Sequence, residues 1–260
     1  MGFAKIPGDK SISHRAAILG ALADGETRVS GLLEGEDVLS TCAAMRALGA
    51  TVEQVPGNTG EWRIQGGGVE ALSAPSEDLD MGNSGTAVRL LMGFVAALPF
   101  SCTFVGDASL SKRPMQRVMT PLGQCGAAFN AAEGGRLPLT VTGLSPAKPI
   151  DYELPVASAQ VKSAILLAGL NAEGETRVIE PRATRDHTEL MLKHFGVNVV
   201  VEELSTGGRS IRLVGGQRLT ARNVVVPADI SSAAFPLVAA LLVPGSEITL
   251  PNIGVNPLRT

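Results

Sequence analysis

A short polar stretch near the N-terminus carries the residue types that bind an anion. Gly8-Asp9-Lys10-Ser11-Ile12-Ser13-His14-Arg15 precedes the apolar segment Ala16–Ala23, which suits a buried helix. Free backbone N–H groups and the helix dipole at such a junction favour a negative charge. Lys10 and Arg15 add two cations, and Ser11 adds a hydroxyl; phosphate and carboxylate groups require such donors. A helix beginning near Ser11 would place Ser11 and Arg15 one turn apart on one face.

Simpler explanations fit the same residues. Ser11 would serve equally well as an ordinary N-cap, with Lys10 and Arg15 in solvent. His14 is a candidate general base, but nothing in the sequence beside it orients the ring, which favours a packing or surface histidine. The motif therefore predicts an anion site without excluding a plain helix start.

Similar polar turns occur where later helices are expected to begin. Asn83-Ser84-Gly85-Thr86 combines capping residues with a glycine that lets a ligand approach the backbone, although capping and packing explain it as well. Pro114 predicts a helix start that leaves Arg113 extended and facing outward. Ser158 and Gln160 are uncharged donors before an apolar run, where capping alone also accounts for Ser158. Cations near these junctions are expected to gather on one face: Lys10, Arg15, Arg89, Lys112, Arg113, Lys162 and Arg185.

An internal repeat organises the chain. Leu19–Val29 reappears as Leu167–Val178, with a weaker copy in Gly93–Gly106 and the start of a fourth at Leu237–Leu242. Each copy reads as an apolar helix, a glycine-containing turn and a β-branched strand, followed by a second helix and further strands. The second helices are closed by Gly49-Ala50, Gly126-Ala127 and Gly196-Val197. Further strands are expected at Thr51–Val55, Trp62–Gln65, Leu139–Thr142, Asn198–Glu202 and Ser210–Leu213. This alternation predicts an α/β protein of three βαβαββ-type units and the truncated start of a fourth.

The composition limits the kinds of partner and site that we expect for this protein. A chain of 260 residues with 45% hydrophobic residues can bury a sizeable core. A net charge of −3 argues against a nucleic-acid or anionic-membrane surface, so an anion site must be a local concentration of cations. The three cysteines show no CxxC spacing and the histidines no metal-ligand spacing, which favours reduced thiols and no metal site. With no signal-peptide pattern and no apolar run long enough to cross a bilayer, we expect a soluble, cytoplasmic protein.

Five motifs in order give the chain its resemblance to a known family. They are Lys10–Arg15 with its preceding turn, Gly82–Arg89, Gly106–Met115, Ser158-Ala159-Gln160 and Thr184–Thr188. The chain resembles 5-enolpyruvylshikimate-3-phosphate synthases, transferases of the shikimate pathway of aromatic amino-acid biosynthesis. The resemblance implies transfer of the enolpyruvyl group from phosphoenolpyruvate to shikimate-3-phosphate through a multiply charged tetrahedral intermediate, without a cofactor. It also implies lobes of three units, with helices inside and sheets outward.

The resemblance assigns roles to particular residues. Phosphoenolpyruvate would be bound by Lys10, Gly85 and Arg113. Shikimate-3-phosphate would be held by Lys10, Ser11, Arg15, Ser158, Ala159, Gln160 and Arg185. Asn83 and Arg89 would support the site, and Ala159 stands where some members have a second serine. Because tolerant members often carry alanine where this chain has Gly85, we expect sensitivity to glyphosate, which occupies the phosphoenolpyruvate pocket in the family.

The length departs from the family pattern, since the chain stops at Thr260, little more than halfway through the usual length. We expect residues 5–245 to form the lobe on the shikimate-3-phosphate side and residues 246–260 to lead into the second. The family's proton-transfer residues lie in that other lobe. The chain alone is therefore expected to be catalytically incomplete, and to need a second chain or the rest of the polypeptide.

Two other functions remain open from the sequence. A UDP-N-acetylglucosamine enolpyruvyl transferase would share the fold, but that family usually carries a reactive cysteine in the loop corresponding to Gly106–Met115. Cys102 precedes that loop and Cys125 follows it. A non-catalytic anion-binding repeat module is the third hypothesis.

Overall fold

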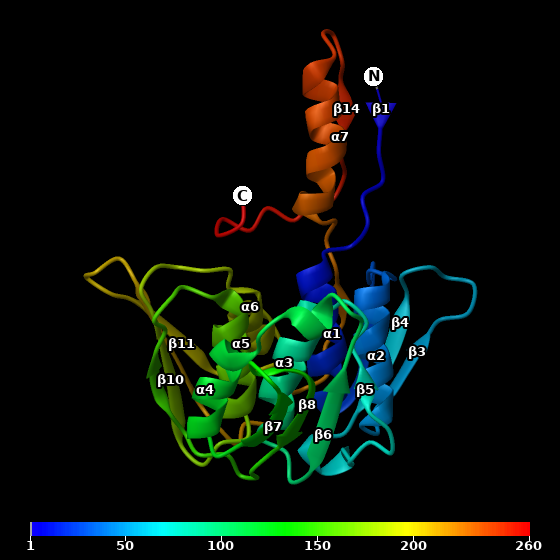
Figure 1. The fold of residues 1–260 in the computed structure, drawn as a ribbon. Coiled ribbons are helices and arrows are strands. Elements are labelled where there is room, and N and C mark those ends of the chain that lie inside the picture. Colours follow the sequence, from blue (N-terminus) through cyan, green and yellow to red (C-terminus); the bar gives the residue numbers. More distant parts are fainter. Residues whose placement is uncertain (1) are drawn as a thin grey trace.

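The computed structural model describes residues 2–260 and confirms the three-unit α/β architecture (Figure 1). The first unit comprises α1 (Lys10–Leu22), β2 (Gly25–Ser30), α2 (Glu36–Ala47), β3 (Thr51–Gln54) and β4 (Trp62–Gly66). The second comprises β5 (Leu79–Asp80), α3 (Gly85–Val95), β6 (Ser101–Val105), α4 (Gln116–Gln124), β7 (Ala128–Ala132) and β8 (Arg136–Thr142). The third comprises β9 (Asp151–Glu153), α5 (Ala159–Gly169), β10 (Glu175–Glu180), α6 (His187–His194), β11 (Val199–Glu203) and β12 (Arg209–Val214). Short 3-10 turns lie at Val69–Ala71 and Leu110–Lys112.

Each unit contributes one four-stranded sheet with the same internal order. The sheets run β5-β6-β8-β7, β9-β10-β12-β11 and β13-β2-β4-β3, where β13 is Val224–Val225. In each, the first strand is parallel to the second, and the remaining neighbours are antiparallel. In the first unit β13 takes the place of the leading strand, with Val224 paired to Val29. The chain therefore returns from the third unit to the first before it reaches residues 230–242.

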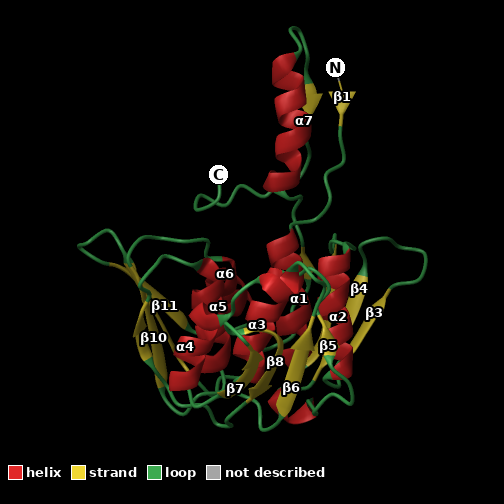
Figure 2. Cartoon of the chain, viewed as in Figure 1, coloured by secondary structure: helices red, strands yellow, loops and turns green. Residues whose placement is uncertain are grey.

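The helices pack inside and the sheets cover them (Figure 2). Helices α1, α3 and α5 carry apolar residues on nearly every side and are buried over most of their length, as expected for helices surrounded by other elements. At Gly93, an added Cβ would lie 2.3 Å from the backbone oxygen of Ala164. This glycine lets the backbones of α3 and α5 approach closely.

The predicted helix ends and strands agree with the structure in most places. Gly49, Gly126 and Gly196 follow α2, α4 and α6 with φ of 103°, 99° and 91°, the left-handed conformation that glycine adopts most easily. The five predicted strands correspond to β3, β4, β8, β11 and β12, with shifted ends. Strand β7 was not predicted, because its sequence, Ala-Phe-Asn-Ala-Ala, is poor in β-forming residues and pairing with β8 holds it.

The last part of the chain stands apart from the three units. Helix α7 (Ile230–Leu242) projects beyond the sheets beside a small parallel pair formed by β1 (Gly2–Phe3) and β14 (Ile248–Thr249) (Figure 1). Only Ala233 of α7 is buried, and Phe235 is 80% exposed. Residues 252–260 then fold back toward the body of the protein (Figure 1). Across residues 2–260, no helix is long and apolar enough to cross a membrane, and no group of His, Cys, Asp or Glu forms a metal site.

Candidate anion-binding site

Three helix N-termini supply the framework of the candidate site. Asp9, Ser84 and Ser158 cap α1, α3 and α5, and each side chain accepts a hydrogen bond from the backbone N–H three residues later, at 2.9, 3.1 and 3.4 Å. The capping alternative for Ser11 is therefore wrong, because Asp9 takes that role and α1 begins at Lys10. The capping explanation for Ser158 is confirmed.

Arg89 joins the motif at the start of α3 to the motif at the start of α5. Its Nη1 donates to the backbone oxygen of Gly85 at 3.0 Å and to Oε1 of Gln160 at 3.1 Å. Gln160 in turn donates from Nε2 to Oγ1 of Thr86 at 3.1 Å. Arg89 and Gln160 are 71 residues apart in the chain, so two distant motifs share one hydrogen-bond network.

Arg113 reaches the same region from the loop after β6. It is extended, as predicted, with φ −84° and ψ 126°, and its Nη2 donates to Oδ1 of Asn83 at 2.7 Å. Asn83 is itself held by a hydrogen bond from its Nδ2 to Asp107 at 2.7 Å. The predicted helix start at Pro114 is displaced: α4 begins at Gln116, because Met115 occupies the N-cap position.

Two guanidinium groups converge on the backbone of Gly85. A Cβ added at this buried glycine would lie 3.0 Å from Nη1 of Arg113 and 3.0 Å from Nη1 of Arg89. Burial lowers the pKa of Arg89, and the neighbouring Arg113 and Arg117 lower it further. The like charges repel one another here, so an anion that bound between them would relieve the repulsion.

Arg15 connects α1 to the third unit and is buried. Its Nε donates to Oγ1 of Thr188 at 2.7 Å, its Nη2 to Oγ of Ser163 at 2.8 Å and its Nη1 to the backbone oxygen of Ser11 at 2.9 Å. Ser11 and Arg15 are one turn apart within α1, as predicted, and the last contact spans that turn. Burial lowers the pKa of Arg15 to about 10, with Arg185 adding to the shift, which leaves Arg15 charged at neutral pH.

Lys10 and His14 have different surroundings. Lys10 is half-exposed and its Nζ lies 2.8 Å from Oδ2 of Asp37. His14 is fully buried, and its Nδ1 lies 2.8 Å from Oγ1 of Thr41. Burial, with a contribution from Arg15, lowers the pKa of His14 to about 3. His14 is therefore a neutral packing histidine, and the general-base candidacy is not supported.

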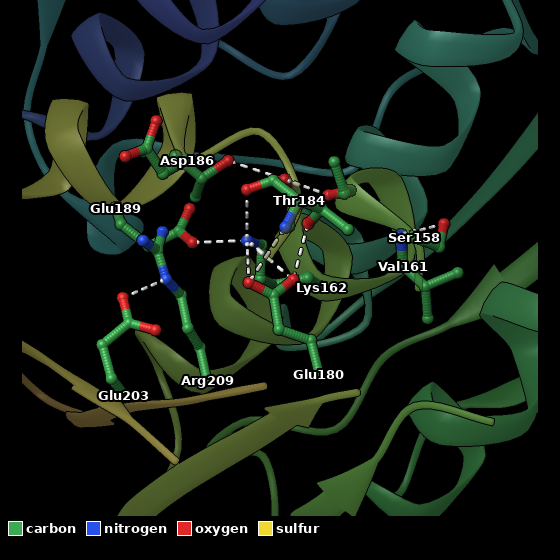
Figure 3. Close-up of polar contacts among 12 residues, drawn as sticks. Ser158, Val161, Lys162, Glu180, Thr184, Asp186, Glu189, Glu203 and Arg209 are labelled. Atoms are coloured by element: carbon green, nitrogen blue, oxygen red, sulfur yellow. Dashed lines mark hydrogen bonds and ion pairs between the residues drawn. The ribbon is translucent and has the colours of Figure 1, made fainter. Parts of the chain in front are cut away.

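Lys162 does not belong to the cationic face that the sequence predicts. Its side chain is fully buried and lies between the carboxylates of Glu180 and Glu189 (Figure 3). The sequence prediction was wrong because Lys162 lies in the first turn of α5 on the side that packs against α6, and only the tertiary contacts show this.

An open, mostly polar cavity of about 590 Å³ lies beside the N-terminus of α5. Its wall includes four predicted residues, Ser158, Ala159, Gln160 and Arg185. Two further cations, Arg182 and Arg259, line the same cavity. Arg182 could have been suggested by its place in the loop with Arg185. Arg259 could not, since it reaches the cavity only because residues 252–260 fold back.

Comparison with known proteins decides the family. The family model described as EPSP synthase (3-phosphoshikimate 1-carboxyvinyltransferase) matches residues 1–260. The chain belongs to the EPSP synthase family. This confirms the resemblance inferred from the motifs.

Relatives and solved structures agree with this assignment. The chain is 66% identical over 259 residues to the 3-phosphoshikimate 1-carboxyvinyltransferase of Paramagnetospirillum magneticum, which covers 100% of the chain and 58% of the relative. The enzyme of the same name from Granulibacter bethesdensis is 64% identical over 256 residues, 98% of the chain and 56% of the relative. The structure of EPSP synthase from Acinetobacter baumannii matches with a TM-score of 0.90 and 50% identity, over 100% of this chain and 57% of that one. The chain thus spans little more than half the length of these relatives.

Most of the residues to which the resemblance assigns roles lie close together in the structure. Asn83, Gly85, Arg89, Arg113 and Gln160 form one contact network. Ser158, Ala159, Gln160 and Arg185 line one cavity. Arg15 donates to Ser163, whose hydroxyl donates to the backbone oxygen of Ala159, and Ser11 lies one helical turn before Arg15. Lys10 contacts Asp37 instead. The arrangement can bind and orient small molecules that carry several negative charges.

Proposed function

We propose that the protein transfers the enolpyruvyl group from phosphoenolpyruvate to shikimate-3-phosphate, with this chain supplying one half of the site. The observation that carries the proposal is the convergence of Arg89 and Arg113 on Gly85, next to a separate cavity that holds Arg185. Two neighbouring cationic regions suit a reaction that joins two anionic substrates. Family membership supplies the identity of those substrates.

The two regions take different substrates in this proposal. Phosphoenolpyruvate binds at Lys10, Gly85 and Arg113, where Asn83 holds the guanidinium of Arg113 in place and Arg89 contacts the backbone of Gly85. Shikimate-3-phosphate occupies the cavity, with its phosphate and hydroxyl groups bound by Lys10, Ser11, Arg15, Ser158, Ala159, Gln160 and Arg185. Fixed cations then stabilise the extra negative charge of the tetrahedral intermediate without having to reorganise.

The second half of the site comes from the rest of the polypeptide or from a second chain. Helix α7 supports this part of the proposal, because it exposes Phe235, Leu241 and Leu242 at 80%, 76% and 76%. A helix with such an apolar surface needs a covering partner. Residues 5–245 would then form the lobe on the shikimate-3-phosphate side, and residues 246–260 would lead into the lobe that supplies proton transfer. We place the reaction in the cytoplasm, where the protein's buried thiols would stay reduced.

The alternative enolpyruvyl transferase, which acts on UDP-N-acetylglucosamine, is less well supported. Its reactive cysteine has no counterpart in the loop between β6 and α4. Cys102 is buried within β6, where burial raises its pKa to about 12, and Cys125 is buried after α4, with its pKa raised to about 11. A thiol with so high a pKa is a poor nucleophile at neutral pH.

Turnover by the full-length protein, meaning this chain together with the second half that the proposal requires, tests the function. We expect release of inorganic phosphate when phosphoenolpyruvate and shikimate-3-phosphate are both present, and none with UDP-N-acetylglucosamine. Arg113→Ala should lower the rate strongly, whereas Arg28→Ala should not, because Arg28 is 69% exposed on the outer sheet beside Glu26. Phosphate release with UDP-N-acetylglucosamine would favour the alternative. Anion binding without turnover of either pair would favour the non-catalytic module.

A further inference from the structure

A buried ion cluster lies next to the loop that carries Arg185. Nζ of Lys162 is 3.1 Å from Oε2 of Glu180 and 2.7 Å from Oε1 of Glu189 (Figure 3). All three side chains are almost completely inaccessible to solvent, with exposures of 0%, 0% and 4%. Lys162 is on α5, Glu180 ends β10 and Glu189 is on α6, so the cluster joins three elements of the third unit.

The same cluster fixes the loop between β10 and α6 through Thr184. The backbone N–H of Thr184 donates to Oε1 of Glu180 at 3.2 Å, and its hydroxyl donates to Oε2 at 2.6 Å. Nζ of Lys162 donates to the backbone oxygen of Thr184 at 3.4 Å (Figure 3). Three polar groups of one residue are thus held by the Lys162–Glu180 pair. Thr184 and the next residue, Arg185, both line the cavity.

Stability is a weak explanation for such a cluster. Removing charges from water costs several kcal/mol for each ion, and well-packed apolar side chains often replace a buried ion pair without loss. The cluster is also incompletely satisfied, because Oε2 of Glu189 has no hydrogen-bond partner among the described residues. Burial raises the pKa of Glu189, against the effect of Lys162. What the cluster does provide is directional contact to a loop that would otherwise be held by few hydrogen bonds.

We propose that Lys162 and Glu180 are positioning residues for the anion site, acting through Thr184 to direct Arg185 into the cavity. Neither residue touches the substrate in this account. Which ligand is affected rests on the proposed function. The fixed position of the loop does not depend on it.

Thr184 offers the cleanest substitution, because Lys162→Met leaves two carboxylates buried without a cation and risks loss of the fold. Thr184→Val keeps the shape and removes the hydroxyl bond to Glu180, whereas Thr184→Ser keeps that bond. In the full-length protein we expect Thr184→Val to weaken shikimate-3-phosphate binding by about tenfold, and Thr184→Ser to change it by less than about twofold. Affinity for phosphoenolpyruvate should stay within about twofold in both variants, because its proposed region lies on α1, α3 and the loop after β6, away from Thr184.

A double substitution separates positioning from general damage. If Thr184 acts through Arg185, then Thr184→Val should cost little further affinity in an Arg185→Ala background. Equal losses in both backgrounds would overturn the proposal. So would an unchanged affinity of Thr184→Val for shikimate-3-phosphate.

Hydrogen exchange tests, without any ligand, whether the Lys162–Glu180 pair fixes the loop that carries Arg185. The amide of residue 184, which donates to Glu180 in the wild type, should exchange faster in Thr184→Val and in Glu180→Gln, while those of α5 remain protected. Unchanged exchange in both variants would refute the role of the cluster. Failure of the wild type to bind shikimate-3-phosphate would instead contradict the proposed function and leave the exchange result to decide this inference.

Discussion

A single methyl group added at Gly85 should disturb the anion site and spare the fold. In Gly85→Ala the new Cβ would lie 3.0 Å from a nitrogen of Arg113 and 3.0 Å from a nitrogen of Arg89. Both atoms are the ends of flexible side chains, so each guanidinium can move by a few tenths of an ångström. Gly85 does not have a left-handed φ, and alanine favours a helix over glycine. We therefore expect the free energy of unfolding to stay within about 1 kcal/mol of the wild type.

The substitution Gly85→Ala should instead weaken the binding of an anion between Arg89 and Arg113. Overpacking costs typically about 1–3 kcal/mol, and flexible neighbours place this case at the lower end. About 1 kcal/mol corresponds to roughly a fivefold loss of affinity for phosphoenolpyruvate. Glyphosate, which by family resemblance occupies the same pocket, is longer and should lose more, approaching the roughly 150-fold that about 3 kcal/mol represents.

The assay is inhibition of the full-length protein by glyphosate, measured together with the KM for phosphoenolpyruvate. The wild type should be sensitive, and Gly85→Ala should raise the inhibition constant by a larger factor than it raises KM. Gly123→Ala is the matched control, because a Cβ there meets nothing within 4 Å. Equal inhibition of the wild type and Gly85→Ala would remove Gly85 from the pocket and refute the proposed placement of that loop.

Three further outcomes follow from the structure. Burial holds the pKa of His14 near 3 instead of 6.5, so the folded state binds fewer protons than the unfolded state between these pH values. Lowering the pH from 7 to 5 should therefore reduce the free energy of unfolding by about 2 kcal/mol through His14 alone. His14→Asn keeps a partner for Thr41 and removes the titrating ring. Chemical denaturation should therefore show a smaller loss of unfolding free energy between pH 7 and pH 5 in this variant, and the same loss as in the wild type would contradict the reasoning. Gly93→Ala should destabilise the protein by about 3 kcal/mol, since its Cβ would meet the backbone of Ala164 at 2.3 Å; an unaltered melting temperature would argue against the α3–α5 packing. The 260-residue chain by itself should fold but show no synthase turnover, and phosphate release from both substrates by this chain alone would refute the division of the site.

Most of the correct predictions rest on local patterns in the sequence. The apolar helix, glycine turn and strand recur because each unit buries the same kind of helix against the same kind of sheet. The glycines that close the second helix of each unit, Gly49, Gly126 and Gly196, likewise fall at equivalent places. The helix N-termini were readable for the same reason, since caps and cations stand next to each other in the chain. Even there, the choice between Asp9 and Ser11 as the cap depended on a shift of two residues in the start of the helix.

Long-range contacts decided what the sequence could not. Lys162 reads as one more cation at a helix start, and only its contacts with Glu180 and Glu189 show that it is buried and paired. Val224–Val225 is too short to predict as a strand, yet it completes the first sheet. Arg259 enters the cavity wall through ion pairs with Asp229 and Asp9, at 2.9 and 3.8 Å. None of these pairings leaves a periodic signal in the sequence.

Titration calorimetry of shikimate-3-phosphate into the full-length protein tests the central claim most directly. The account predicts binding by the wild type, a loss of at least about tenfold in Arg185→Ala, and no change in Arg28→Ala, whose side chain lies on the outer sheet. Wild-type affinity in Arg185→Ala, or an equal loss in Arg28→Ala, would contradict the assignment of the cavity beside α5 to this substrate.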